Sequence, residues 1–163
     1  MRFLFTTVLL CSIAAHTQAQ QYDSIPAYRK DSMLPTFSIL QTDSTWFVNN
    51  YTKKEVYIPM RDGIKLFTTF YIPNDKTEKH PFLMVRTPYS CAPYGENKYS
   101  GIWRTYQMAY LRENYIIVTQ DVRGRFMSEG EYEDIRPFNK NKKTTTDIDE
   151  ASDTYDAIDW MIH

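Results

Sequence analysis

Two short polar motifs in this chain each follow an apolar run, and their residue types could take part in chemistry at one edge of a sheet. The first motif is Arg86-Thr87-Pro88-Tyr89, which follows the apolar run 82–85. The second motif extends from Gln120 to Gly130 and follows the apolar run 115–119. Because short continuous apolar runs are typical of buried strands, we expect two strands that open into polar loops. The sequence therefore places candidate chemistry at the edge where these loops leave the sheet.

The chain offers few residues for nucleophilic or metal-assisted catalysis. It contains no Gly-x-Ser-x-Gly sequence, so Ser128 lacks the frame in which a nucleophilic serine is presented. The histidines are His16, His80 and His163, and none lies where a catalytic base is expected. Three scattered histidines do not make a metal site, and we expect neither a metal nor a cofactor. Cys91 could act as a nucleophile in principle. The favoured interpretation is that Cys91 is a buried or loop thiol without a catalytic role.

Length and composition point to one globular domain. The chain has 163 residues, of which 42% are hydrophobic and 15% aromatic, so it can form a packed core. A formal net charge of −1 argues against a nucleic-acid-binding protein, which needs clustered excess lysine and arginine. No run of about 18 apolar residues follows the first twenty, so no membrane span is expected after them.

The N-terminus has the pattern of a secretory signal peptide. A short basic start precedes a mostly apolar stretch, 3–15, and small residues follow at Thr17 and Ala19. This order predicts a signal peptide at residues 1–19, cleaved after Ala19, and hence an exported protein, periplasmic or extracellular. A buried N-terminal helix is the alternative interpretation. Export would leave Cys91 as the only cysteine, so no intrachain disulfide is expected.

Residues 20–50 differ in pattern from the part of the chain that follows them. They are polar and aperiodic, and we expect an N-terminal extension that reaches the domain and contains one helical turn. Apolar residues then alternate over 55–60 and again over 64–72, with Asp62-Gly63 between them, which is a strong signal for a β-hairpin. Pro59 limits its strand to an edge of the sheet or to a ladder position that needs no N–H.

The next elements alternate strands with a helix. Between the two apolar runs, the spacing of four residues predicts a helix: Ile102, Tyr106, Ala109 and Tyr110. Asn114 is placed to end that helix in a left-handed conformation. A strand, a helix and a strand in this order predict a parallel βαβ unit.

A further helix is expected near the C-terminus. Asp147 and Glu150 fit an N-terminal cap, and an acidic first turn suits the helix dipole. The predicted buried stripe of this helix is Ile148, Ala151, Tyr155, Ile158 and Ile162. The whole pattern predicts an α/β fold in which an antiparallel hairpin precedes parallel strands and helices.

Three segments carry a resemblance to a known family. They are Met60-Arg61-Asp62-Gly63-Ile64-Lys65-Leu66, Leu83-Met84-Val85-Arg86-Thr87-Pro88-Tyr89, and Gln120-Asp121-Val122-Arg123-Gly124-Arg125 with Ser128-Glu129-Gly130. With Asp149-Glu150, Asp153, Ala157, Ile158 and Trp160, they resemble the X-prolyl dipeptidyl-peptidase-like serine hydrolases, peptidase family S15. This family includes cocaine esterases, α-amino acid ester hydrolases and glutaryl-cephalosporin acylases. The resemblance implies that residues 51–163 are part of an α/β-hydrolase catalytic domain.

The resemblance also implies a mechanism. In the family, a serine attacks an ester or amide carbonyl of a small-molecule or peptide substrate, and a histidine and an aspartate assist it. A tyrosine hydroxyl completes the oxyanion hole, and the matching position here is Tyr89. For Asp121, Arg123 and Arg125, one interpretation places them at the active-site mouth. The favoured interpretation gives them a supporting role, in which Asp121 and Arg123 hold the loop by ion pairs and Gly124 allows a tight turn.

The sequence departs from the family pattern because the nucleophile is missing. A short loop and one strand would place the serine roughly 10–15 residues beyond His163. We therefore expect the N-terminal half of an α/β-hydrolase fold, truncated before the nucleophile, and expect this chain alone to be inactive. The expected function is the N-terminal portion of an exported serine hydrolase that cleaves acyl ester or peptide-like amide bonds. The alternative is a short secreted binding module or pseudo-enzyme without catalysis.

Overall fold

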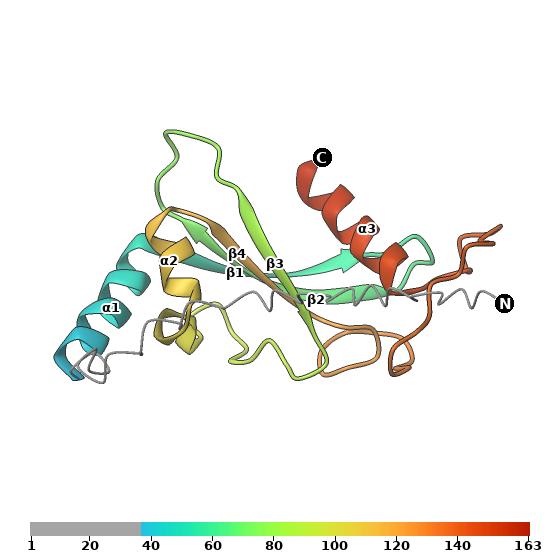
Figure 1. Ribbon diagram of the computed structural model, residues 1–163, viewed down its shortest axis with the longest axis horizontal. Helices are drawn as coiled ribbons and strands as arrows, with labels where there is room; N and C mark the ends of the chain where they lie inside the picture. Colours follow the sequence, from blue (N-terminus) through green and yellow to red (C-terminus); the bar gives the residue numbers. More distant parts are fainter. Residues whose placement is uncertain (1–36) are drawn as a thin grey trace, which may run out of the picture. The chain divides into compact units, whose positions relative to one another are not determined.

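A computed structural model describes residues 37–163 of the chain. Within these residues, four strands form one mixed sheet in the order β1-β2-β4-β3 (Figure 1). The expected signal peptide, 1–19, and the first part of the expected extension lie outside the described residues. The elements are α1 (Phe37–Asn50), β1 (Tyr51–Pro59), β2 (Lys65–Pro73), β3 (Phe82–Thr87), the 3-10 helix η1 (Gly101–Arg104), α2 (Gln107–Arg112), β4 (Ile116–Asp121) and α3 (Glu150–Ile162).

Strands β1 and β2 form the predicted hairpin. They pair antiparallel from Tyr51 opposite Pro73 to Pro59 opposite Lys65. Gly63 adopts a φ of +89° in the turn, which glycine adopts without a steric penalty. Pro59 lies in β1, at an edge of the sheet, as its missing N–H requires. The hairpin prediction is confirmed.

Strands β3 and β4 form the predicted parallel pair. Phe82 lies opposite Ile116, and the register continues to Thr87 opposite Asp121. β4 also pairs antiparallel with β2, so it lies inside the sheet, whereas β3 lies at the edge of the described sheet. All six residues of β3 are therefore only half-buried, and the expectation that this strand is fully buried is wrong.

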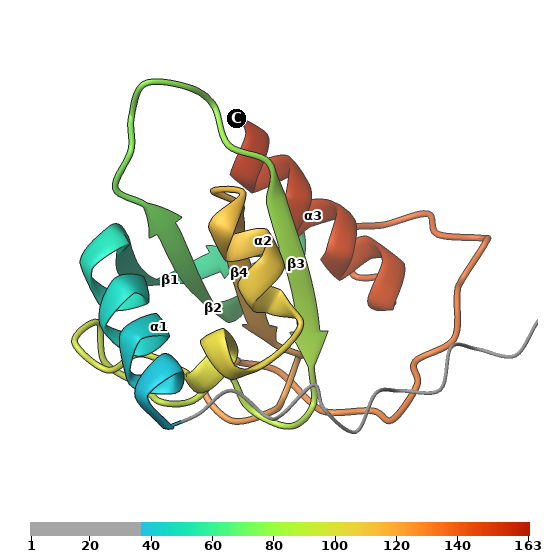
Figure 2. The ribbon, with the colours of Figure 1, turned by 60° about the vertical axis from the view of Figure 1, so that its left-hand side comes forward.

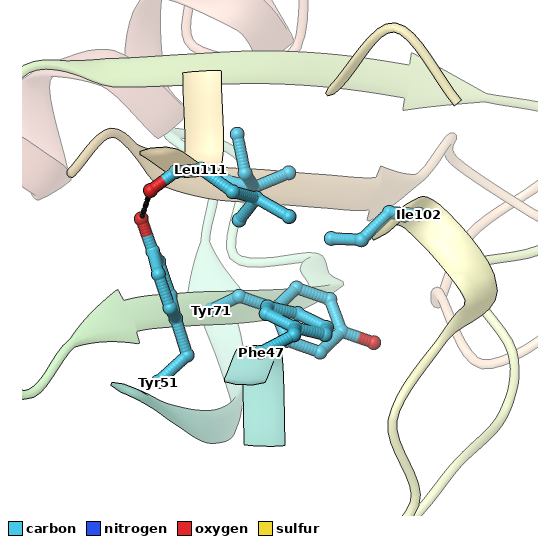
Figure 3. Close-up of a cluster of buried hydrophobic side chains, with 6 residues drawn as sticks. Phe47, Tyr51, Tyr71, Ile102 and Leu111 are labelled. Carbon is cyan, nitrogen blue, oxygen red and sulfur yellow. Dashed lines mark hydrogen bonds between the residues drawn. The ribbon is translucent and has the colours of Figure 1, made fainter. Parts of the chain in front are cut away.

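Helix α1 is longer than the single helical turn that was expected in the extension. It spans 14 residues and ends where β1 begins. Phe47 explains its stability, because this side chain is fully buried and its ring centroid lies 5.3 Å from those of Tyr51 and Tyr71 (Figure 3). The Tyr51 hydroxyl donates a 2.7 Å hydrogen bond to the Leu111 carbonyl, which joins β1 to α2. Tertiary packing therefore makes a helix where the local sequence pattern is weak.

The helices cover both faces of the sheet. Figure 2 shows α1 and α2 on one face and α3 on the other. Successive strand residues point to opposite faces, so Ile117 belongs to the core beneath α1 and α2, while Val118 belongs to the core beneath α3. The two clusters are Phe47, Tyr51, Tyr71, Ile102, Leu111 and Ile117 on the first face, and Ile58, Met60, Leu66, Phe70, Val118 and Ala157 on the second.

The crossover between β3 and β4 is less regular than predicted. It contains η1 and the six-residue helix α2 in place of one continuous helix. Ile102 is buried in η1, but Tyr106, Ala109 and Tyr110 are exposed, and the buried residues of α2 are Gln107 and Leu111. The expected helical face is therefore confirmed only at Ile102. Asn114 does end the helix with a φ of +57°, as predicted.

Helix α3 docks on the sheet through a face that the sequence pattern did not indicate. Its buried residues are Ser152, Asp153 and Ala157, while the predicted stripe residues Ala151, Tyr155, Ile158 and Ile162 are exposed in the described structure. One reason is electrostatic, because Asp153 pairs with Arg86 of β3 and with Arg123 of the loop after β4. The expected cap at Asp147 and Glu150 is also wrong. Asp149 caps the helix, and its side chain and that of Ser152 form a reciprocal capping box.

Asp149 should make the stability of the protein depend on pH. Burial raises the pKa of this carboxyl, but hydrogen bonds from Lys142, the Asn139 amide and the Ser152 amide outweigh burial and hold the pKa well below its ordinary value. This stabilisation is present above about pH 4, the ordinary Asp value, and is lost as the pH falls below it. We expect Asp149→Asn to flatten the fall in unfolding free energy between about pH 5 and about pH 2 in urea titrations.

Two variants complete this measurement. Asp149→Ala also removes the cap, and should lower the unfolding free energy at neutral pH by about 0.5–2 kcal/mol. Glu78→Gln removes an exposed carboxylate and should leave the pH dependence as it is. If the two carboxamide variants gave the same pH dependence, Asp149 would not be the group responsible.

Candidate active site

The two polar motifs meet at one edge of the sheet. β3 and β4 are parallel, so the loop after β3 and the loop after β4 leave from the same edge (Figure 2). The Val122 amide donates a 3.1 Å hydrogen bond to the Thr87 carbonyl, which continues the strand pairing into the loops. The Arg125 Nε atom donates a 3.2 Å hydrogen bond to the Pro88 carbonyl. The structure therefore brings residues 86–89 and 120–130 together.

Tyr89 lies just beyond the C-terminal end of β3 and points away from the core. Its side chain is 85% exposed. Its amide donates a 3.0 Å hydrogen bond to the Thr87 Oγ1 atom, and the next residue, Ser90, has a φ of +89°. This geometry presents a neutral hydroxyl donor from a sharply turned backbone. Its predicted role as an oxyanion donor remains a prediction.

Asp121 holds both loops by hydrogen bonds. Its side chain is fully buried, and Oδ1 accepts a 2.8 Å hydrogen bond from the Cys91 amide. Oδ2 accepts hydrogen bonds from the Tyr94 hydroxyl at 3.1 Å and from the Met127 amide at 3.3 Å. The structure corrects the expectation that this residue acts by an ion pair, because its partners are two amides and a phenol.

The Ser128 hydroxyl forms two hydrogen bonds to buried backbone groups. The Oγ atom donates a 2.6 Å hydrogen bond to the Asp121 carbonyl and accepts a 2.8 Å hydrogen bond from the Phe67 amide. The residue is 9% exposed. A hydroxyl that joins two buried backbone groups in this way is not available as a nucleophile.

Arg123 forms the ion pairs that hold the second loop against the hairpin turn and α3. Its side chain is 5% exposed, with Nη1 2.8 Å from Asp62 Oδ2 and Nη2 2.7 Å from Asp153 Oδ1. Burial lowers the pKa of the guanidinium, but the hydrogen bonds to Asp153 and Asp62 outweigh burial and raise it. Three segments that are distant in the sequence are thus joined by one buried cation.

Gly124 follows with a φ of +69° and leaves no room for a side chain. A Cβ atom at this position would lie 2.1 Å from the Tyr132 backbone nitrogen. The Gly124 amide donates a 2.9 Å hydrogen bond to the Glu129 carbonyl. Glycine is therefore required both by the backbone conformation and by the close approach of another part of the loop.

Arg86 belongs to the same network of buried ion pairs, and no individual role was predicted for it from the sequence. Its Nε atom donates to Gln120 at 2.8 Å, and its Nη1 atom donates to Glu150 Oε2 at 2.7 Å and to Thr154 at 2.9 Å. Nη2 lies 3.6 Å from Asp153. The signal in the sequence that could have identified this contact is a cation at the end of an apolar strand, together with two acids three residues apart on α3.

The cysteine and the histidines do not supply a catalytic group at this edge. Cys91 is 5% exposed, and burial, followed by its contact with Asp121, raises the pKa of its thiol, which disfavours the reactive thiolate. His80 precedes β3 and bonds to the Asp75 carbonyl, while His163 ends α3 and lies near Asp159. A cleft of about 670 Å³ near His163 is lined by no residue of the two motifs.

No group of three or more His, Cys, Asp or Glu side chains is placed to hold a metal ion in residues 37–163. None of the described helices is both long enough and apolar enough to span a membrane. The chemical group available at this edge of the sheet is the Tyr89 hydroxyl, a hydrogen-bond donor. Asp121 supports the loop that carries Tyr89, and Arg123 supports the neighbouring loop after β4.

Comparison with known proteins assigns this arrangement to a family. Residues 62–163 match the family model described as X-Pro dipeptidyl-peptidase (S15 family). The chain is 31% identical over 115 residues to cocaine esterase from Rhodococcus sp. (strain MB1 Bresler), covering 69% of this chain and 17% of the esterase. Two solved structures, an α-amino acid ester hydrolase and an aminopeptidase from a marine sediment Thaumarchaeota archaeon, are 36% and 39% identical, each with a TM-score of 0.57. Each covers 69% of this chain, which spans only 19% of either structure.

Proposed function

The chain belongs to the X-Pro dipeptidyl-peptidase (S15) family, and on that premise we propose that it forms the N-terminal part of a serine hydrolase that cleaves acyl ester or peptide-like amide bonds. The mixed sheet matches part of an α-amino acid ester hydrolase, which supports an α/β-hydrolase catalytic domain in residues 51–163. Because the chain spans less than a fifth of these relatives, the nucleophilic serine, the aspartate and the histidine are proposed to lie in a segment outside these 163 residues.

The observation that carries the proposal is the exposed hydroxyl of Tyr89 beside the end of β3. In the proposed reaction, the serine Oγ attacks the substrate carbonyl carbon and its proton passes to the histidine. The carbonyl oxygen becomes an oxyanion, to which the Tyr89 hydroxyl and the amide after the serine donate hydrogen bonds. The histidine then protonates the leaving group, and water hydrolyses the acyl-enzyme.

Export is part of the same proposal. The basic start, the apolar stretch and the small residues at Thr17 and Ala19 support cleavage of a signal peptide after Ala19. Mass spectrometry of the secreted or periplasmic protein should find Gln20 at its N-terminus. A mature protein that retains Met1 would contradict export by this route.

The hydrolase proposal is tested on the complete gene product that carries residues 1–163. We expect it to hydrolyse p-nitrophenyl esters and to be labelled at one serine by a fluorophosphonate probe, with loss of activity in proportion to labelling. A heat-denatured sample controls for unspecific labelling. A folded protein that neither hydrolyses these esters nor takes up the probe would overturn the proposal and favour a non-catalytic binding module.

A further inference from the structure

Lys53 is buried in an unusual way for a lysine. It lies in β1, its side chain is fully buried, and its ammonium nitrogen is surrounded by backbone and carboxylate oxygens. A buried ammonium group is strongly unfavourable unless it is paired and hydrogen-bonded, so its surroundings have to satisfy it. The neighbouring Lys54 shows the ordinary situation, because its side chain is 52% exposed.

Two of the three partners of Lys53 lie in the loop that carries Tyr89. Nζ donates to the Pro93 carbonyl at 2.5 Å and to the Gly95 carbonyl at 3.0 Å. It also lies 2.7 Å from Glu55 Oε1, and this same oxygen accepts a 2.7 Å hydrogen bond from the Gly95 amide. All three N–H donors of the ammonium group thus have an acceptor. Lys53 binds the Gly95 carbonyl and Glu55 binds the Gly95 amide.

The second support of this loop comes from the opposite side. Asp121 accepts hydrogen bonds from the Cys91 amide and the Tyr94 hydroxyl, and the Tyr94 hydroxyl lies 2.8 Å from the Ser90 Oγ atom. Residues 90–95 are therefore held from β1 by Lys53 and from β4 by Asp121. Tyr89 lies directly between this supported segment and the end of β3, so its backbone is fixed on both sides.

We propose that Lys53 is a positioning residue for Tyr89: its buried ammonium group, with Glu55, fixes the loop 90–95 so that the Tyr89 hydroxyl is held where the oxyanion forms. This inference rests on the proposed hydrolase function. A hydrogen-bond donor in an oxyanion hole is effective only when it is held in place before the reaction. A buried charge that binds two carbonyl groups specifies one loop conformation, because any other conformation leaves the charge without its partners.

The structural part of the proposal is measured without any activity. Cys91 lies in the same loop and is 5% exposed, so its alkylation by iodoacetamide, followed by peptide mass spectrometry of the complete gene product, reports opening of the loop. We expect Lys53→Met to raise the alkylation rate at least about tenfold, which corresponds to about 1.4 kcal/mol of lost loop stability. Lys54→Met is the matched control and should leave the rate unchanged. Equal rates in the wild type and in Lys53→Met would overturn the proposal, whether or not the protein is active.

The catalytic part is measured by combining Lys53→Met with Tyr89→Phe. We expect Lys53→Met to lower kcat for a p-nitrophenyl ester by about 10- to 100-fold with little change in KM, which is less than the loss of the whole donor. In the Tyr89→Phe background the same substitution should have almost no further effect, because the hydroxyl that it positions is absent. An equal loss in both backgrounds would show that Lys53 supports the fold alone and would overturn the positioning role.

If Lys53→Met does not fold, a second variant, Glu55→Gln, tests the same proposal. Glu55→Gln keeps an acceptor for the Gly95 amide but removes the carboxylate that neutralises Lys53, so the same two measurements should shift in the same direction by smaller factors. A wild-type protein that hydrolyses no ester would overturn the hydrolase proposal and the catalytic role of Lys53 together. The alkylation rates of Cys91 would still show separately whether Lys53 holds the loop.

Discussion

Replacing Tyr89 by phenylalanine should lower kcat of the complete gene product by about 10²–10³-fold for a p-nitrophenyl ester, the loss that follows removal of one oxyanion donor. The change removes a single hydroxyl from a side chain that is 85% exposed. The loop contacts made by the Tyr89 amide and by Cys91 are not altered by it. We therefore expect the effect to appear in kcat, with KM and the free energy of unfolding close to their wild-type values.

The control for this experiment is Tyr106→Phe, which removes another hydroxyl from a tyrosine that is 71% exposed and lies before α2. It should leave kcat unchanged. Steady-state kinetics and urea denaturation of both variants separate a catalytic effect from a loss of structure. If Tyr89→Phe retained full kcat, the oxyanion assignment would be wrong, although the family assignment would stand.

The strands were predictable because their signals are local. Asp62-Gly63 between two alternating runs is sufficient to specify a hairpin, and Pro59 has few alternatives to an edge strand. The parallel pairing of β3 with β4 follows from two apolar runs that are joined by a helical crossover. The position of Tyr89 beside the second motif is a consequence of this pairing, so the candidate site could be located from the sequence.

The helices were less predictable because long-range contacts decide how they pack. α1 owes its place to the packing of Phe47 against Tyr51 and Tyr71, which no local pattern of segment 37–50 indicates. α3 turns Asp153 toward the sheet because buried arginines attract it, although apolar periodicity favoured another face. Hydrophobic periodicity assumes that the buried face is apolar, and this assumption fails where ion pairs are buried.

The supporting residues of the site were missed for the same reason. Arg86 and Lys53 are charged, and charged residues are rarely fully buried, so the sequence alone favours a solvated position for each. Their partners come from elements that are close only after folding, namely α3 for Arg86 and the loop 93–95 for Lys53. A sequence shows which residue types are present, whereas the desolvation that makes these contacts important appears only in the folded chain.

Replacing Arg123 by methionine should lower the free energy of unfolding by about 3–5 kcal/mol, the range for breaking a buried ion pair by removal of one partner. The substitution preserves much of the side-chain volume but leaves Asp62 without its cation and takes from Asp153 its shortest ion pair. Burial then disfavours both carboxylates. The loss should be visible as a large shift of the urea midpoint at neutral pH, measured by circular dichroism or tryptophan fluorescence.

A second arginine variant separates the contribution of the buried Arg123 ion pairs from that of an exposed ion pair. Arg136→Met breaks a more exposed pair with Glu133, at 3.3 Å, and should cost no more than about 1 kcal/mol. In the double variant Arg123→Met with Asp153→Asn, one buried carboxylate is neutralised, so the total loss should be smaller than the sum of the two single losses. Additive losses in the double variant would mean that Arg123 and Asp153 act independently. A small loss of unfolding free energy in the single variant Arg123→Met would mean that this cation is not needed to hold the loop after β4 at the edge of the sheet.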